Sequence, residues 1–155
     1  MHDRTDILNW RIIPHITVDD ANAAIAFYER TFGARVIHRY TVPDGDKILH
    51  AALDFHGAEL FLSDDFPEYS RQPSSPAALG GSPVLLHLDV PDVDAVFTRA
   101  LEQGARADMP LMDQFWGARY GQFTDPFGHR WAVQTQRQYL TDEQLQEAAR
   151  KAFTH

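Results

Sequence analysis

The chain has 155 residues, a formal net charge of −8 and an apolar fraction of 44%. This negative charge excludes nucleic acid and anionic membrane surfaces as expected partners, because both are bound by basic surfaces. The sequence contains no cysteine, which excludes disulfides and thiolate metal ligands. No apolar run is long enough to span a bilayer, and residues 1–10 lack the apolar core of a signal peptide, so we expect a cytoplasmic protein.

The first half of the chain reads as one strand, one helix and three more strands. Residues 11–18 alternate in polarity and predict a strand. Asp19 or Asp20 can cap the next segment, whose apolar residues recur at helical spacing until Gly33 ends the helix. The three further strands are predicted at residues 36–42, 48–55 and 59–63.

The second half repeats this order. Asp92 can cap a helix that ends at Gly104, and four strands surround it, at residues 84–90, 107–112, 119–123 and 130–134. The two halves align residue by residue, because Val18 matches Val90 at an offset of 72 and Gly57 matches Gly128 at an offset of 71. This repeat indicates an internal duplication.

The duplication predicts an α+β fold of two βαβββ modules in one domain, residues 10–153. The modules span about 10–63 and 84–136, and each is too small to bury its own faces. Residues 64–83 are rich in proline, serine and glycine, and we expect a linker without an element of its own.

The C-terminal residues predict a separate amphipathic helix. Thr141 followed by Gln144 forms a capping box, and an apolar stripe continues to residue 153. We expect this helix, residues 141–153, to pack on the body of the protein or on a second subunit.

Several stretches resemble the vicinal oxygen chelate superfamily, which includes glyoxalases, bleomycin-resistance proteins and extradiol dioxygenases. They are FYERTFGA after the first strand and DPFGHRW before the last. Longer stretches, GGSPVLLHLDVPDVDAVF, DQFWGARYGQFTDPFGHRW and LTDEQLQEAARKAF, look like its PhnB-like branch. The resemblance covers residues 10 to 153 and implies the glyoxalase fold, but this fold carries many different chemistries.

The resemblance also implies where a metal would be bound. Superfamily enzymes usually hold one divalent ion through four side chains, one from each of four strands that face a cup. On this sequence the family pattern places these positions at Ile13, Phe61, Leu85 and Ala132. None of the four side chains can coordinate a metal, so we expect an apolar cup and no metal cofactor.

A displaced metal site is the alternative. Residues two apart on a strand share a face, so His15, His87 and Glu59 point the same way as three of the family positions. These side chains could bind zinc, iron, nickel or manganese. The fourth equivalent position is Arg130, a cation that disfavours a metal and could instead pair with Glu59.

Within an apolar cup the same polar residues could orient an organic ligand. We expect the ligand to contact four polar side chains and four aromatic ones, of which any aromatic could equally belong to the core. These residues are His15, Glu59, His87, Arg130, Phe61, Trp116, Tyr120 and Trp131. His50 could also reach the cup or have a structural role, and the sequence assigns no role to His38.

Three functions remain open at this point. The first is a metal-free, PhnB-like protein that binds a small organic molecule, and its resemblance to bleomycin-resistance proteins implies sequestration of an antibiotic or metabolite. The second is a metal-dependent, glyoxalase-like lyase or isomerase, or a dioxygenase. The third is a scaffold or regulator with a vestigial cup.

We expect a homodimer, because superfamily modules often complete their sheets across subunits.

Overall fold

Both halves of the chain form a βαβββ module, in a computed structural model that describes residues 9–69 and 72–154. The first module contains β1 (His15–Val18), α1 (Ala21–Phe32), β2 (Arg35–Thr41), β3 (Ile48–Phe55) and β4 (Ala58–Asp64). The second contains β5 (Leu85–Asp89), α3 (Val93–Glu102), β6 (Arg106–Asp113), β7 (Ala118–Thr124) and β8 (Arg130–Gln136). The predicted fold class is therefore confirmed, and the first strand is shorter than the predicted residues 11–18.

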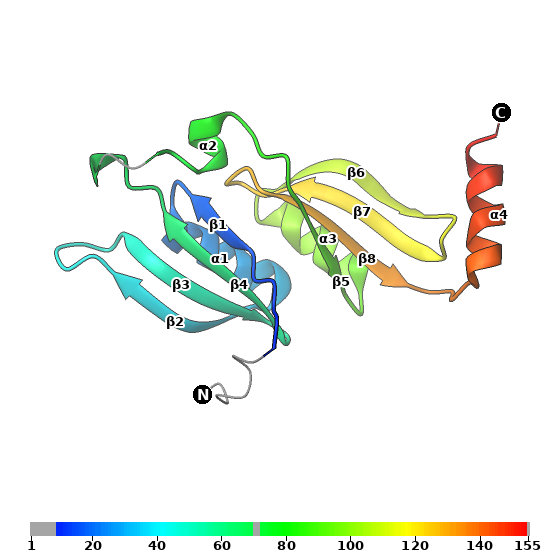
Figure 1. Ribbon diagram of the computed structural model, residues 1–155, viewed down its shortest axis with the longest axis horizontal. Coiled ribbons are helices and arrows are strands. Elements are labelled where there is room, and N and C mark those ends of the chain that lie inside the picture. The colour runs from blue at the N-terminus through cyan, green and yellow to red at the C-terminus, as the bar shows by residue number, and fades with distance from the viewer. Residues whose placement is uncertain (1–8, 70–71, 155) are drawn as a thin grey trace.

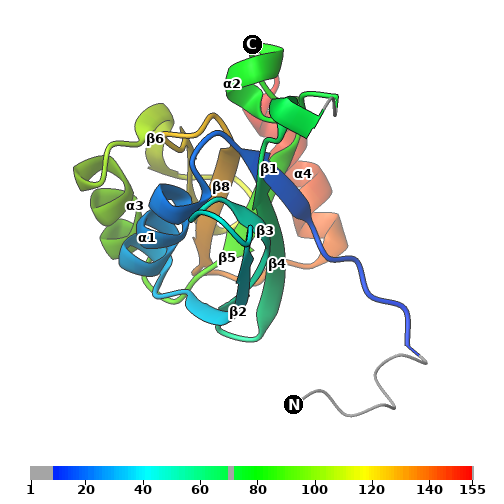
Figure 2. The same cartoon turned by 90° about the vertical axis from the view of Figure 1, so that its left-hand side faces the viewer.

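The two modules have the same sheet topology. Each forms a four-stranded sheet, with the orders β1-β4-β3-β2 and β5-β8-β7-β6. The first strand of each module pairs in parallel with the last, and all other pairs are antiparallel. Figure 1 shows the two sheets side by side, and Figure 2 shows α1 and α3 together on one side of them. Each sheet therefore has one face that a helix covers and an opposite face, which we call its open face.

The predicted caps fix the start of both long helices. Asp20 accepts a hydrogen bond from the backbone N–H of Ala23 at 3.1 Å, and Asp92 accepts one from Ala95 at 3.2 Å. At the end of α1, Gly33 takes the left-handed conformation (φ +70°) that a glycine adopts at little cost. The local sequence signals thus set the length of these helices.

In each module a side chain of the last strand accepts a hydrogen bond from the first N–H group of the helix, and the two side chains occupy equivalent positions in the repeat. Asp64, at the end of β4, accepts hydrogen bonds from the N–H of Ala21 at 2.8 Å and of Ile48 at 2.6 Å. Thr135, at the corresponding place in β8, accepts one from the N–H of Val93 at 2.9 Å. The carboxylate of Asp64 is buried at the end of the strand. It satisfies backbone donors that burial removes from water.

A single hydrophobic core joins the modules. Rings of Tyr28, Phe32 and Phe55 surround Trp131, which is only 2% exposed. Tyr28 donates a hydrogen bond of 2.5 Å from its hydroxyl to Asp125, and Trp131 donates one of 2.9 Å to the same carboxylate. Burial raises the pKa of the Tyr28 hydroxyl well above its usual value, and the Asp125 charge raises it further. Neither module could form this core alone.

The linker between the modules contains short helical segments, which the sequence reading did not predict. They are the 3-10 turn η2 (Pro67–Tyr69) and the helix α2 (Pro76–Leu79). The carboxylate of Asp65 accepts hydrogen bonds from the N–H groups of Ser74 and Ser75, at 3.0 and 2.9 Å. Ser75 in turn caps α2, so the described part of the linker is held to the first module.

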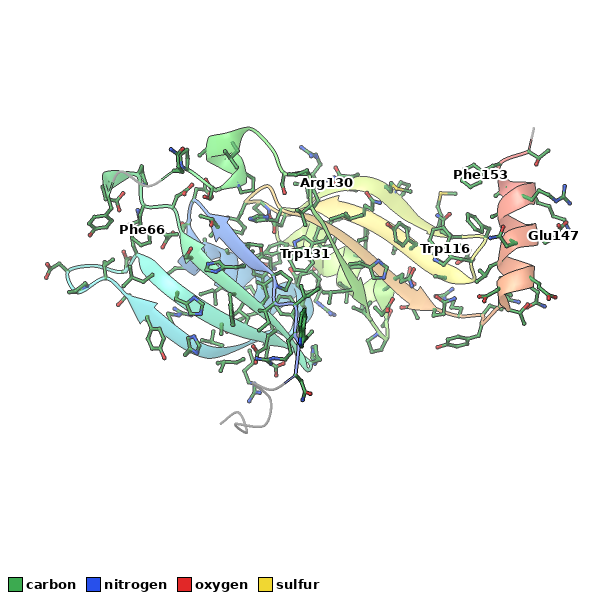
Figure 3. The ribbon with its side chains drawn as sticks, viewed as in Figure 1. Phe66, Trp116, Arg130, Trp131, Glu147 and Phe153 are labelled. Atoms are coloured by element: carbon green, nitrogen blue, oxygen red, sulfur yellow. The ribbon has the colours of Figure 1, made fainter. Side chains whose placement is uncertain are left out.

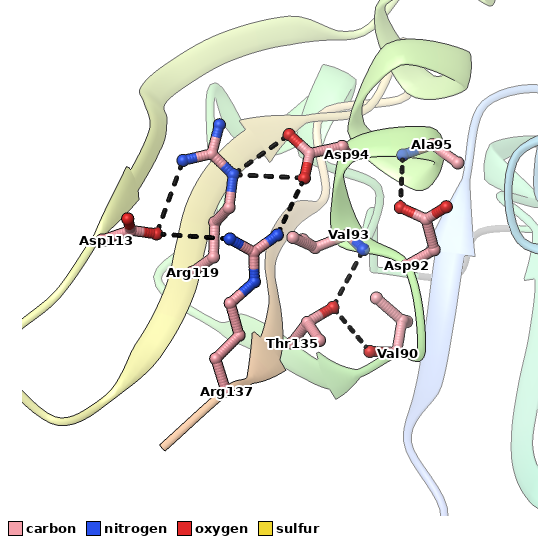
Figure 4. Close-up of polar contacts among 9 residues, drawn as sticks. All are labelled: Val90, Asp92, Val93, Asp94, Ala95, Asp113, Arg119, Thr135 and Arg137. Atoms are coloured by element: carbon pink, nitrogen blue, oxygen red, sulfur yellow. Dashed lines mark hydrogen bonds and ion pairs between the residues drawn. The ribbon is translucent and has the colours of Figure 1, made fainter.

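Ion pairs hold the start of α3 against the second sheet (Figure 4). Asp94 lies 3.0 Å from Arg119 on β7 and 3.4 Å from Arg137 beyond β8. Asp113, at the end of β6, lies near both arginines. The hydrogen bond and charge of Asp94 raise the pKa of the Arg119 guanidinium. The pairs therefore connect the helix with three strands at one end of the module.

The C-terminal helix α4 (Asp142–Ala152) stands beyond the end of the second sheet (Figure 1). Its predicted capping box is confirmed, because Thr141 and Gln144 exchange hydrogen bonds of 3.1 and 2.9 Å. No residue of α4 is buried. Just after the end of the helix, Phe153 contacts the body of the protein, and its ring lies 6.0 Å from that of Phe115. The helix thus leaves most of its surface accessible.

Candidate functional site

The strand register decides which side chains share an open face. In the first sheet, paired residues place His15, Phe61, Ala52 and His38 in one row across the four strands. On the second sheet the row that contains His87 also contains Ala132 and Gln122. The duplicated histidines thus occupy equivalent places on two separate sheets.

A cavity of about 410 Å³ lies between the modules. This volume is within the range of small-molecule sites, which are mostly apolar with a few polar groups. Its polar side chains include Glu59 and His87. Its apolar lining includes Ile13, Leu85, Leu86, Leu88 and Trp131. Two of the four family metal positions, Ile13 and Leu85, therefore line this cavity, and both are aliphatic as the sequence showed.

The two polar candidates of the cavity have charged neighbours. Glu59 Oε1 lies 3.7 Å from Arg11 Nη1, and the Glu59 side chain is 11% exposed. His87 Nε2 lies 3.1 Å from the carboxylate of Asp89, which also accepts a hydrogen bond from Gln134. An acidic and a basic group therefore stand at the same mostly apolar cavity.

The third residue of the alternative metal site lies elsewhere. His15 contacts the rings of His50 and Phe61 and lies 3.4 Å from the Ser63 hydroxyl. It borders a neighbouring cavity of about 640 Å³ beside β1. Among residues 9–69 and 72–154, no group of three or more histidine or carboxylate side chains is arranged to hold a metal ion. The side chains present thus do not fit the metal that the fold family implies.

The remaining candidates are distributed over the second module. Tyr120 lies on the open face near His87, with ring centroids 6.2 Å apart, and Trp116 packs edge-on against it at 5.2 Å. Trp116 also donates a hydrogen bond of 3.0 Å to Gln134. Arg130 borders a different cavity, with Arg106 and α2. Figure 3 shows Trp116 near α4 and Arg130 near the middle of the molecule.

Trp131 is the candidate aromatic residue that the core buries most completely. It alternates with Arg130 and Ala132 along β8, so its side chain points to the helix-covered face. The ring is almost fully buried and belongs to the core, while the residue borders the inter-module cavity. Core packing was the alternative reading for this residue, and the structure shows that packing.

Sequence reasoning missed a group of three histidines on the open face of the first sheet. The ring of His50 lies 5.6 Å from that of His15 and 5.1 Å from that of His38. Burial lowers the pKa of the His50 imidazole from its usual value, and His38 and His15 lower it further. The alternating pattern of each strand places each histidine on a face, but only the pairing between strands brings the three together.

The paired modules, the shared core and the cavity between them define the class of protein. Residues 11–133 match the family model of the Glyoxalase/Bleomycin resistance protein/Dioxygenase superfamily. The chain belongs to this superfamily. Among the residues that the structure describes, no helix is long and apolar enough to cross a membrane.

Known proteins similar to this chain agree with the family. An uncharacterised protein of Mycobacterium tuberculosis strain H37Rv is 50% identical over 121 residues, which cover 77% of this chain and 71% of that protein. The crystal structure of TioX from Micromonospora sp. ML1 shares 26% identity and a TM-score of 0.63, covering 83% of this chain and 99% of TioX. A PhnB protein of Bacillus cereus shares the fold, with 20% identity, a TM-score of 0.61 and coverage of 81% and 99%.

Proposed function

We propose that this protein is a PhnB-like member of the superfamily that binds a small organic molecule in the cavity between its modules, without the usual metal. The observation that carries the proposal is the composition of this cavity, in which aliphatic side chains occupy two family metal positions. Such a surface gains free energy by excluding water from an apolar ligand, at roughly 25 cal/mol per Å² buried. Glu59 and His87 orient polar groups of the ligand.

Sequestration requires shape and apolar contact but no reactive group. The fold and family are compatible with several chemistries, and the absence of a donor atom at Ile13 and Leu85 favours binding. The ligand class is therefore an apolar organic molecule with at least one polar substituent. An antibiotic or a metabolite would satisfy this description.

The test is a thermal-shift screen of such molecules with and without a chelator. A ligand that binds the native state raises Tm at saturating concentration, and we expect the increase to survive chelation. Leu85→Trp fills the cavity from the edge strand β5 and should abolish the increase. Leu79→Trp, on α2 and outside the cavity lining, is the matched control and should retain it.

Two results would overturn the proposal. One is a ligand response that requires a divalent metal and disappears with the chelator, as a metal-dependent lyase, isomerase or dioxygenase would show. The other is a response that Leu85→Trp leaves intact, because the ligand would then bind outside the cavity.

We also propose that the chain forms a homodimer. Large apolar side chains at both ends of the described chain are exposed, including Trp10 at 102%, Ile12 at 97% and Phe153 at 77%. The apolar stripe of α4 finds little cover on its own chain. A second copy would bury these residues.

A further inference from the structure

A second cavity, of about 660 Å³, lies where the end of α1 and the start of α3 meet the turn between β3 and β4. We call it the helix-side cavity. It shares only Phe55, Ala58 and Leu88 with the lining of the inter-module cavity described above. Most of its other lining is apolar, including Phe32 and Val96, and its volume suits a small organic ligand.

Two basic side chains stand at one end of the helix-side cavity, next to the C-terminus of α1. His56 Nε2 lies 2.8 Å from the carbonyl oxygen of Phe32, and Arg99 Nε donates a hydrogen bond of 3.0 Å to the carbonyl oxygen of Thr31. These carbonyls hold one nitrogen of each side chain in place. Within residues 9–69 and 72–154 Arg99 forms no ion pair, so its two terminal nitrogens are available to a ligand.

The backbone of His56 adopts a conformation that residues other than glycine rarely take. Its φ is +55°, and it is the only non-glycine residue with a positive φ in the described part of the chain. Strained positions of this kind persist where the surroundings hold them, and they cluster at functional sites. Here the strained residue brings its imidazole to the basic end of the cavity.

An acidic side chain stands at the other end of the helix-side cavity, where α3 begins. Asp92 caps this helix with one oxygen, which accepts the N–H of Ala95 (Figure 4), and its second oxygen is available. Asp92, Val96 and Arg99 lie four and seven residues along the chain, and therefore on one face of α3. The helical rise places the start and end of this row roughly 10 Å apart. An anionic and a cationic group thus flank an apolar stretch of fixed length.

We propose that the helix-side cavity binds an ω-amino carboxylate, an elongated zwitterion with an apolar chain between its charges. The ligand carboxylate accepts hydrogen bonds from Arg99, its ammonium group donates to Asp92, and its chain packs against Val96 and Phe32. The inference does not depend on the function proposed above, because the charged groups and most of the lining differ between the two cavities.

The test measures the binding of 8-aminooctanoate to the full-length chain by isothermal titration calorimetry. Octanoate and octylamine have the same apolar chain, but each carries only one of the two charges. Each should bind about fivefold more weakly than 8-aminooctanoate, because one solvent-exposed ion pair is lost. The shorter 4-aminobutanoate cannot reach both charged groups and should bind more weakly than 8-aminooctanoate as well.

Two variants remove one charge of the site each. Asp92→Asn keeps the helix cap, since asparagine caps as well as aspartate. It should weaken 8-aminooctanoate by about fivefold without weakening octanoate. Arg99→Gln keeps a donor for the Thr31 carbonyl, and it should weaken 8-aminooctanoate by about fivefold without weakening octylamine. Asp20→Asn is the matched control, because it removes the same charge at the equivalent cap of α1, outside the cavity lining, and should bind 8-aminooctanoate as the wild type does.

Equal affinity for 8-aminooctanoate and its two singly charged analogues would overturn the inference, as would unchanged binding in both Asp92→Asn and Arg99→Gln. Leu85→Trp fills the inter-module cavity but lies outside the lining of the helix-side cavity, so it should bind 8-aminooctanoate normally. Loss of binding in Leu85→Trp would place the ligand in the inter-module cavity. That result would overturn this inference while supporting the proposed function.

Discussion

At the scale of single residues, Asp125 shows how a turn can join two modules. Its carboxylate accepts hydrogen bonds from the hydroxyl of Tyr28 and the indole of Trp131, and from the N–H groups of Phe127 and His129 within its own turn. His129 then reaches the backbone carbonyl of Thr17 in the first module at 2.9 Å. One buried carboxylate therefore organises a turn, a core tryptophan and the neighbouring helix.

We expect Asp125→Ala to lower the free energy of unfolding by on the order of 3 kcal/mol. The substitution leaves two buried side-chain donors without an acceptor, and each such loss is costly. Urea denaturation followed by tryptophan fluorescence measures the effect. Tyr28→Phe removes only one of these donors and should cost less than half as much. Wild-type stability of Asp125→Ala would contradict this account.

His50 gives a second prediction at this scale, for the dependence of stability on pH. Its pKa is lower in the folded state than in the unfolded chain, so folding favours the neutral imidazole. This contribution to stability is fully present above the unfolded pKa of about 6.5. It is lost as pH falls from there through the folded pKa. His50→Phe should therefore show a shallower loss of stability between pH 7 and pH 5, measured by urea midpoints. A slope equal to that of the wild type would show that His50 does not contribute.

At the scale of elements, the sequence predicted most of the fold but only part of the site. The helix caps at Asp20, Asp92 and Thr141 depend on neighbours within three residues, and the sequence identified Asp92 and Thr141 and narrowed the first cap to Asp19 or Asp20. The contacts of Asp64 with α1 and β3 span 43 and 16 residues, and no local pattern indicates them. The group of three histidines on the first sheet was missed for the same reason, since strand pairing is a long-range property.

At the scale of the whole molecule, the exposed α4 bears on assembly. We expect sedimentation velocity at micromolar concentration to show a dimer for the wild type. Leu145→Glu places a charge in the apolar stripe of α4 and should shift the protein to monomer without changing its secondary structure. Gln146→Glu adds the same charge at an exposed neighbouring position and should remain dimeric. A monomeric wild type would contradict the proposed homodimer.

The duplication has left two copies of one scaffold with different open faces. Around His15 the first sheet presents further imidazole rings and Phe61, whereas around His87 the second presents the ring of Tyr120 and the amides of Gln122 and Gln134. The helices, turns and core that carry these faces lie on the other side of each sheet. Substitutions on one face can therefore accumulate without disturbing the core or the other face. A single short chain can in this way acquire a new binding specificity on one half while the other half keeps its own.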